Sequence, residues 1–184
     1  SDKFLEGLGN TYFYIGPDRD KGLLDGLDYQ ASGSLEKSDF ILTTGPNNGS
    51  DRPGMYDELL ERANNHVLPM ICANPDRVVV RQTGERLLCA GALADRYERL
   101  GGHVVYFGKP HPEVYNQSIE TNKKNIIAIG DNLRTDIRGA ANMNYDSLFI
   151  TGGIHNKEIQ NEGIESVLKK YDVKTTYYQS SLKW

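Results

Sequence analysis

Short β-rich runs recur along the chain, and several of them are apolar on consecutive residues. These runs constrain the fold more than any other feature, because a strand with one solvated face alternates apolar and polar residues, whereas a strand covered on both faces need not. The pattern is typical of a parallel sheet covered by helices. The runs are 11–15, 39–43, 67–73, 103–107, 125–129 and 146–150.

Segments with helical spacing separate the runs. Apolar side chains at this spacing share one face of a helix, and such faces pack against a core. The alternation of strands and helices therefore predicts an α/β fold with right-handed crossovers. The apolar stripes are Met55, Leu59 and Ala63; Leu93, Tyr97 and Leu100; and Ile164, Val167, Leu168 and Tyr171.

The composition argues against several kinds of partner. The 184 residues carry 21 Lys and Arg against 25 Asp and Glu, a net charge of −4, without a basic cluster, so nucleic acid is not an expected partner. No apolar run approaches the ~20 residues that span a bilayer, so no membrane partner is expected. Cys72 and Cys89 are the only cysteines and form no CxxC pair, and no signal-like segment leads the chain, which favours a cytoplasmic location.

The segment from Asn125 to Asp136 carries the strongest chemical signal. An apolar strand runs into Gly130 and Asp131, and a second acid, Asp136, follows five residues later. At the carboxyl end of a parallel strand, where open α/β sheets bind ligands, Asp131 can bind a hard cation such as Mg²⁺. Thr135 is the expected cap of the following helix, which puts Asp136 in its first turn. The alternative is that both acids only finish a loop and cap a helix.

Lys109 follows the apolar run 103–107 in the tripeptide Gly108-Lys109-Pro110. Proline keeps Lys109 in an extended conformation, where a lysine can neutralise phosphate oxygens or an attacking carboxylate. A helix predicted over 112–121 separates Lys109 from Asp131. In one parallel sheet, both residues would then lie at the same edge and face one pocket. The alternative is an ordinary solvated lysine in a turn.

Five segments of the chain read, in this order, ICANPDR, CAGALADRYERLGG, GKPHPEVYNQSI, IAIGDNLRTDIRGA and LFITGGIH. Together they resemble class IIA hydrolases of the haloacid dehalogenase superfamily. That branch contains phosphatases of small phosphate esters, with an α/β cap inserted into a Rossmann-like core. The resemblance implies a cap domain over 1–105 and the C-terminal half of the core over 106–184.

The resemblance also implies roles for individual residues. Lys109 matches the core lysine that steadies the nucleophile and the phosphate, Asp131 matches the Mg²⁺ ligand, and Asp136 matches the supporting acid. The segment Asn74, Pro75 and Asp76 matches the cap loop that overhangs the substrate. Asn-Pro is equally a common strand-ending turn, so both interpretations of this loop stay open.

One family element has no clear counterpart in the 184 residues. Family members begin with an apolar strand ending in DxDG, whose first Asp attacks phosphorus, followed by a second strand that ends in Ser or Thr. Asp18-Arg19-Asp20 and Thr43-Thr44 imitate these elements, but Gly16-Pro17 places the first acid two residues beyond its strand. Both stretches align with the cap of the family. A reading in which Asp18 is the nucleophile remains a third possibility.

Two main hypotheses follow. The first is a Mg²⁺-dependent phosphatase of a small phosphorylated metabolite, with this chain as a fragment that lacks the nucleophile and is inactive alone. The alternative is a non-catalytic binding or assembly module derived from such a phosphatase. A half-core leaves sheet edges uncovered, which predicts a homo-oligomer or self-association through those edges. The substrate itself is not predicted, because a fold does not specify its ligand.

Overall fold

The computed structural model describes residues 7–81, 83–119 and 125–183. The chain divides into two compact units. The first comprises Ser1–Val79 and Arg86–Phe107, and the second comprises Val80–Glu85 and Gly108–Trp184. Both units contain parallel sheets and helices, so the predicted α/β class is confirmed.

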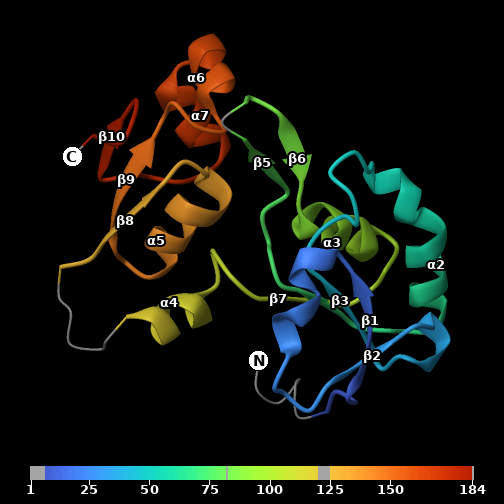
Figure 1. Cartoon of the computed structure of the whole chain (residues 1–184). Helices are drawn as coiled ribbons and strands as arrows, with labels where there is room; N and C mark the ends of the chain where they lie inside the picture. Colours follow the sequence, from blue (N-terminus) through green and yellow to red (C-terminus); the bar gives the residue numbers. More distant parts are fainter. Residues whose placement is uncertain (1–6, 82, 120–124, 184) are drawn as a thin grey trace. The chain divides into compact units, whose positions relative to one another are not determined.

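The first unit is built on a five-stranded parallel sheet in the order β2-β1-β3-β4-β7 (Figure 1). Its central strand β3 is buried at every position, as expected for a strand covered on both faces. The strands are β1 (Thr11–Ile15), β2 (Gln30–Ser32), β3 (Phe40–Thr43), β4 (Met70–Cys72) and β7 (Val104–Tyr106), and a separate hairpin contains β5 (Val78–Val80) and β6 (Arg86–Leu88).

Helices cover this sheet and close its core. Helix α3 (Ala90–Arg99) contacts β4 and β7, and α2 (Asp57–Asn65) contacts α3. The stripe of α3 is confirmed, since Leu93 and Tyr97 are fully buried. The unit also contains three short 3₁₀ segments, namely η1 (Asp18–Leu24), η2 (Leu35–Lys37) and η3 (Pro53–Tyr56).

Two sequence predictions in this unit are corrected. The run 67–73 forms a strand only from Met70, because Val67 has a φ of 55° in the turn that ends α2. Met55 precedes α2, lies in η3 and is 70% exposed, so the buried face of this helix is formed by Leu60 and Ala63. Ala63 is buried as predicted and Leu59 packs partly buried against the core, so only Met55 departs from the predicted stripe, because it lies in the 3₁₀ turn before the helix.

The second unit contains a three-stranded parallel sheet in the order β10-β9-β8. Its apolar core comprises five buried side chains, Leu133, Ile137, Phe149, Val167 and Val173. The strands are β8 (Ile127–Gly130), β9 (Asp146–Ile150) and β10 (Tyr177–Gln179), and the helical segments are α4 (Pro112–Ser118), η4 (Leu133–Ile137), α5 (Arg138–Asn142), α6 (Asn156–Glu162) and α7 (Ile164–Lys170). The helix predicted over 112–121 corresponds to α4, and Thr121 lies outside the described residues.

Short exposed strands were not predicted. Strands β2 and β10 are three residues each and largely exposed, so they carry no continuous apolar run. Within the described residues, no helix combines the length and the apolar character needed to cross a membrane.

Tyr97 offers a test of the first core. Its ring is fully buried, burial raises the pKa of its phenol to about 12, and its hydroxyl donates a 2.5 Å hydrogen bond to the Leu68 carbonyl. We expect Tyr97→Phe to lower the free energy of unfolding by about 1–2 kcal/mol, because the carbonyl loses its donor. Urea denaturation followed by circular dichroism measures this loss.

The control is Tyr177→Phe, at a side chain that is 57% exposed. It should change the free energy of unfolding by less than about 0.5 kcal/mol. Equal losses in both variants would contradict the role assigned to the buried hydroxyl of Tyr97.

Candidate active site

Strand β8 ends at Gly130 and places Asp131 at its carboxyl end, where the sequence predicted it. One carboxylate oxygen of Asp131, Oδ2, accepts a 3.0 Å hydrogen bond from the backbone N–H of Ile154. The other oxygen, Oδ1, has no hydrogen-bond partner among the residues that the structure describes. Asp131 is therefore held by one oxygen and offers the second to a ligand.

A glycine makes room for this carboxylate. A Cβ atom on Gly153 would overlap both the carboxylate and the Cβ of Asp131. Gly153 therefore has to lack a side chain for Asp131 to adopt its observed position. Gly130 has the same role on the other side of the loop, because a Cβ there would overlap the carboxyl group of Asp136.

The loop after Asp131 turns into η4, a π-helical turn that leads into α5. Its cap is Asn132, whose side-chain oxygen accepts a 3.0 Å hydrogen bond from the Arg134 N–H. The prediction that Thr135 caps this helix is therefore wrong. Helical geometry begins three residues earlier than expected, since Asn132 can accept hydrogen bonds from the first turn as well as threonine does. Thr135 is instead buried inside the turn.

Asp136 joins two segments of the second unit. Its Oδ1 accepts a 2.5 Å hydrogen bond from the Lys109 ammonium, and its Oδ2 accepts a 3.1 Å hydrogen bond from the Asn132 N–H. The Asp136 side chain is only 10% exposed, whereas that of Lys109 is 47% exposed. The structure thus brings Lys109 and the Asp131–Asp136 loop together, with Asp136 as the direct partner of the lysine.

The route by which Lys109 reaches this site differs from the prediction. Its preceding strand β7 belongs to the five-stranded sheet, whereas β8 belongs to the three-stranded sheet, so the two residues do not follow neighbouring strands. Gly108, with a φ of 113°, turns the chain after β7, and the turn is closed by a 3.0 Å hydrogen bond from the His111 N–H to the Gly108 carbonyl. A positive φ of this size is readily adopted only by glycine.

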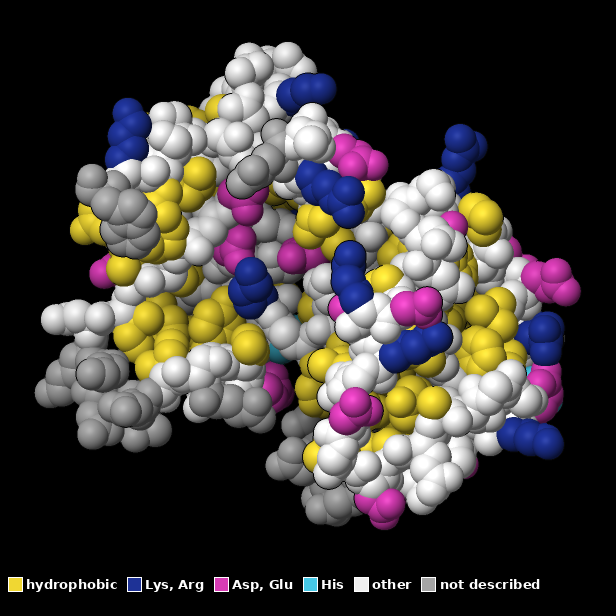
Figure 2. Space-filling model, in the orientation of Figure 1, with side chains coloured by type: hydrophobic (Ala, Val, Ile, Leu, Met, Phe, Trp, Pro, Cys, Tyr) yellow, Lys and Arg dark blue, Asp and Glu magenta, His cyan; other side chains and the backbone are white. Residues whose placement is uncertain are grey.

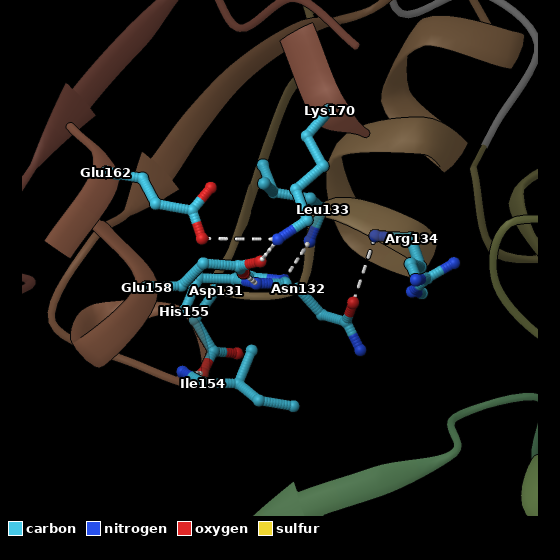
Figure 3. Close-up of polar contacts among 9 residues, drawn as sticks. All are labelled: Asp131, Asn132, Leu133, Arg134, Ile154, His155, Glu158, Glu162 and Lys170. Carbon is cyan, nitrogen blue, oxygen red and sulfur yellow. Dashed lines mark hydrogen bonds and ion pairs between the residues drawn. The ribbon is translucent and has the colours of Figure 1, made fainter. Parts of the chain in front are cut away.

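A buried histidine, to which the sequence analysis assigns no role, supports the same loop (Figure 3). The ring of His155 is 7% exposed, and its Nε2 accepts a 3.3 Å hydrogen bond from the Leu133 N–H. Its Nδ1 lies 2.9 Å from Oε2 of Glu158, and Oε1 of Glu158 accepts a 2.6 Å hydrogen bond from Lys170. Lys170 also contacts Glu162 at 3.3 Å. His155, Glu158 and Glu162 lie at the start and along one helix, α6, but their contacts with Leu133 and Lys170 join this helix to η4 and α7, which sequence spacing does not reveal.

Glu158 is the charged centre of that network. Burial raises the pKa of its carboxyl, but hydrogen bonds from Lys170, His155 and Tyr171 outweigh burial and lower the pKa to about 2. Glu158 is therefore ionised at neutral pH and can accept a hydrogen bond from the Nδ1–H group of His155.

The loop Asn74, Pro75 and Asp76 lies in the first unit, directly after β4. The side-chain oxygen of Asn74 accepts a 3.2 Å hydrogen bond from the Asp76 N–H, an Asx-type turn. The Gly91 N–H, near the start of α3, donates to the carbonyls of Asn74 and Asp76 at 3.0 and 3.1 Å. The strand-ending turn is thus observed, and the role in substrate contact stays a prediction.

Asp18 lies in the first unit, at the start of η1. Its carboxylate is 90% exposed and pairs with Lys21 at 2.7 Å, and the hydrogen bond from Lys21 lowers the pKa of Asp18. The cation that pairs with Asp18 is thus a neighbour in the same 3₁₀ segment, and this pair gives no support to the interpretation of Asp18 as a nucleophile.

The donor set around Asp131 fits a hard cation that brings further ligands of its own. Within residues 7–81, 83–119 and 125–183, no group of three His, Cys, Asp or Glu side chains could hold a metal ion. Mg²⁺ needs no such cage, because it binds through one or two carboxylates and takes its other oxygens from water and phosphate. Asp131, one carboxylate oxygen of which has no partner in the described part of the chain, matches that requirement.

Open α/β folds bind ligands at the carboxyl ends of parallel strands, and the structure places Asp131 at such an end, on the loop that also carries Asp136, the partner of Lys109. Comparisons with known proteins identify the family. The HAD-hydrolase-like family model matches residues 106–182. A haloacid dehalogenase-like hydrolase from Brucella suis is 32% identical to this chain and superposes on it with a TM-score of 0.81. The match covers 99% of this chain and 69% of the Brucella suis chain. The chain belongs to the haloacid dehalogenase-like hydrolase family, as the resemblance predicted.

More distant structures share the fold. A p-nitrophenyl phosphatase from Archaeoglobus fulgidus is 16% identical, with 97% of this chain and 68% of that chain covered and a TM-score of 0.67. A glycerol phosphate phosphatase from Mycobacterium tuberculosis, in complex with magnesium, is 18% identical, with 96% and 53% covered and a TM-score of 0.68. These likenesses agree with the predicted fold, a Rossmann-like core with an α/β cap. No curated protein sequence matches the chain.

The glycine beside Asp131 gives a test of the site geometry. We expect Gly153→Ala to displace the Asp131 carboxylate and to lower the free energy of unfolding by about 1–3 kcal/mol, as overpacking does. Urea denaturation gives the stability, and the shift of the Ile154 amide resonance reports the loss of its hydrogen bond.

The matched control is Gly33→Ala, because a Cβ atom at Gly33 would meet nothing within 4 Å. It should change the stability by less than about 0.5 kcal/mol. An unshifted Ile154 amide in Gly153→Ala would show that the carboxylate does not occupy the space beside Gly153.

Proposed function

We propose that this chain is part of a Mg²⁺-dependent phosphatase that acts on a small phosphorylated metabolite. The observation that carries the proposal is the state of Asp131, which stands at a strand tip with one oxygen fixed and the other without a hydrogen-bond partner among the described residues. The magnesium-bound phosphatase from Mycobacterium tuberculosis, which shares the fold, supports the choice of metal. Bound Mg²⁺ would supply positive charge to neutralise the phosphate oxygens.

The residues of this chain would bind and orient the reactants. Asp131 would hold the metal through Oδ1, while the Ile154 N–H keeps the carboxylate in place. Lys109, about half exposed, would supply a point charge for the phosphate or for an attacking carboxylate. Asp136 would act through Lys109, because its buried carboxylate fixes both the ammonium group and the loop that carries Asp131.

We further propose that the attacking aspartate lies outside these 184 residues and that the chain is inactive alone. No apolar strand in the sequence ends in DxDG, and the chain covers 69% of the related Brucella suis hydrolase. Removing a covalent nucleophile from another hydrolase lowered turnover by about 10⁶-fold, or roughly 8 kcal/mol of barrier. Lys109 and one metal ligand would not restore that loss.

The first unit would then serve as the cap. We propose a cap over 1–105, with the loop Asn74, Pro75 and Asp76 contacting the substrate, and a half-core over 106–184. The turn that fixes this loop on the start of α3 supports the idea, since a rigid loop can present backbone groups to a ligand. A cytoplasmic setting agrees with the free thiols of Cys72 and Cys89.

The test extends the chain at its N-terminus with the family's apolar strand ending in DxDG. We expect this extended protein to release phosphate from p-nitrophenyl phosphate in Mg²⁺, whereas the 184 residues alone release none above background. Asp131→Asn in the extended protein should lower the rate by at least about 100-fold, because the metal loses its anionic ligand.

The control replaces the first Asp of the added DxDG by Asn, which should abolish turnover while leaving the fold intact by circular dichroism. A folded extended protein without Mg²⁺-dependent release would contradict the proposed function. Activity of the 184 residues that Asp18→Asn removes would instead establish the third reading.

A second candidate function, a non-catalytic assembly module, is favoured by the edges of the three-stranded sheet. The two edge strands expose large apolar side chains, between 42% and 57% of each, which are Ile127, Ile129, Tyr177 and Tyr178. Figure 2 shows that hydrophobic side chains are exposed on the visible face of this unit. Exposed apolar edge strands are templates for pairing with another chain.

We therefore expect the 184-residue chain to self-associate with rising concentration in sedimentation velocity. A charged side chain on the edge should prevent pairing, so Ile129→Lys is expected to shift the protein towards monomer. The matched control is Val80→Lys, at a similarly exposed apolar side chain of the β5–β6 hairpin. A wild-type chain that remains monomeric at all concentrations would rule out assembly through these edges.

A further inference from the structure

We propose that His155 is a positioning residue for the metal-binding loop. It would hold the backbone of Leu133 so that Asp131 keeps the orientation in which Oδ1 faces a Mg²⁺ ion. The inference rests on the proposed function, because it assumes that Asp131 binds the metal. Neither the family resemblance nor the sequence spacing assigned this histidine a role.

The contacts of His155 begin at the loop itself. Leu133 lies two residues after Asp131, and its N–H donates to Nε2 of His155 at 3.3 Å. The residue before His155, Ile154, donates its own N–H to Asp131 Oδ2 at 3.0 Å. Residues 154 and 155 therefore hold the loop by two hydrogen bonds, one to the Asp131 carboxylate and one from the Leu133 backbone N–H (Figure 3).

The hydrogen bonds fix the state of the imidazole ring. An N–H group only donates, so the bond from Leu133 requires Nε2 to be unprotonated. The ring proton of the neutral imidazole then sits on Nδ1, where the Glu158 carboxylate accepts it at 2.9 Å. Lys170 and Glu162 complete the chain of contacts and keep Glu158 in place. The Leu133 N–H thus determines which ring nitrogen of His155 accepts, and the Glu158 carboxylate accepts from the other nitrogen.

Because His155 and Leu133 are both buried, losing the hydrogen bond between them would be unfavourable. The side chain of His155 is 7% exposed, and Leu133 is fully buried in the apolar core of the unit. Without the imidazole nitrogen, the Leu133 N–H would have to find another partner in an apolar environment or go without one, which is unfavourable. The loop would then relax, and the carboxylate of Asp131 two residues earlier would lose its orientation.

Apolar packing alone does not explain a histidine at this position. The ring lies 4.7 Å from that of Tyr171 and 6.2 Å from that of Phe149, measured between centroids. A phenylalanine would satisfy both ring contacts and avoid burying two polar nitrogens. The polar contacts on both sides of the ring are what distinguishes histidine from phenylalanine here.

The experiment measures the Mg²⁺ dissociation constant of the 184-residue chain by calorimetric titration. His155→Phe keeps the ring and removes both nitrogens, and we expect about 10-fold weaker binding, the lower end of what outer partners of metal ligands contribute. His155→Gln can place its side-chain oxygen near the position of Nε2 and accept from Leu133. It should bind within about 3-fold of the wild type, since the backbone contact is rescued.

A second readout needs no metal. Hydrogen exchange at the Leu133 amide should accelerate at least about 10-fold in His155→Phe and much less in His155→Gln, because only the first variant leaves the amide without an acceptor. The control for a general loss of stability is Ser147→Ala, which removes buried hydrogen bonds to Thr175 and Thr176 in the same unit. It should leave the Mg²⁺ affinity within about 2-fold.

The outcomes separate this inference from the proposed function. Unchanged Mg²⁺ affinity in His155→Phe, together with abolished binding in Asp131→Asn, would overturn the inference alone. Equal weakening by His155→Phe, His155→Gln and Ser147→Ala would also overturn it, since stability would then explain the effect. Absence of Mg²⁺ binding by the wild-type chain would overturn the metal role of Asp131 and the inference with it.

Discussion

The second unit depends on one buried carboxylate that joins two parts of the chain. Asp136 accepts a hydrogen bond from Lys109 on one oxygen and from the Asn132 backbone on the other. A buried carboxylate without such partners would be strongly unfavourable, so the acid, the lysine and the loop are stable only together. This arrangement closes the Asp131–Asp136 loop and keeps the half-exposed ammonium of Lys109 beside it. The chemistry proposed for the site follows from that fixed geometry.

The loop is held from the opposite side by backbone and histidine contacts. Ile154 fixes the Asp131 carboxylate, and His155 accepts the hydrogen bond of the Leu133 amide. Both contacts come from the segment between β9 and α6, so the position of α6 and α7 bears directly on the loop. A rigid support of this kind is what a metal ligand requires, because a single carboxylate binds Mg²⁺ well only when it is already oriented.

Sequence reasoning predicted the parts of the site that are local. The apolar run before Gly130 predicts both a parallel strand and its end, and the structure places Asp131 at that end. The cap at Asn132 was missed, because Asn132 and Thr135 are both acceptable cap residues and only the backbone geometry distinguishes them. The support by His155 was missed as well, since Leu133, from whose amide it accepts a hydrogen bond, lies 22 residues earlier on another element.

The sequence by itself determined the α/β class and the family, and it singled out Lys109, Asp131 and Asp136 as candidate site residues, because strand patterns and short motifs are formed by consecutive residues. Only the tertiary structure decided how these residues meet. Lys109 follows a strand of one sheet and Asp131 a strand of another, yet the turn at Gly108 brings the lysine to Asp136. The reason is physical: hydrogen bonds between distant segments depend on where the chain turns and what it buries, and neither is encoded in the spacing of a motif.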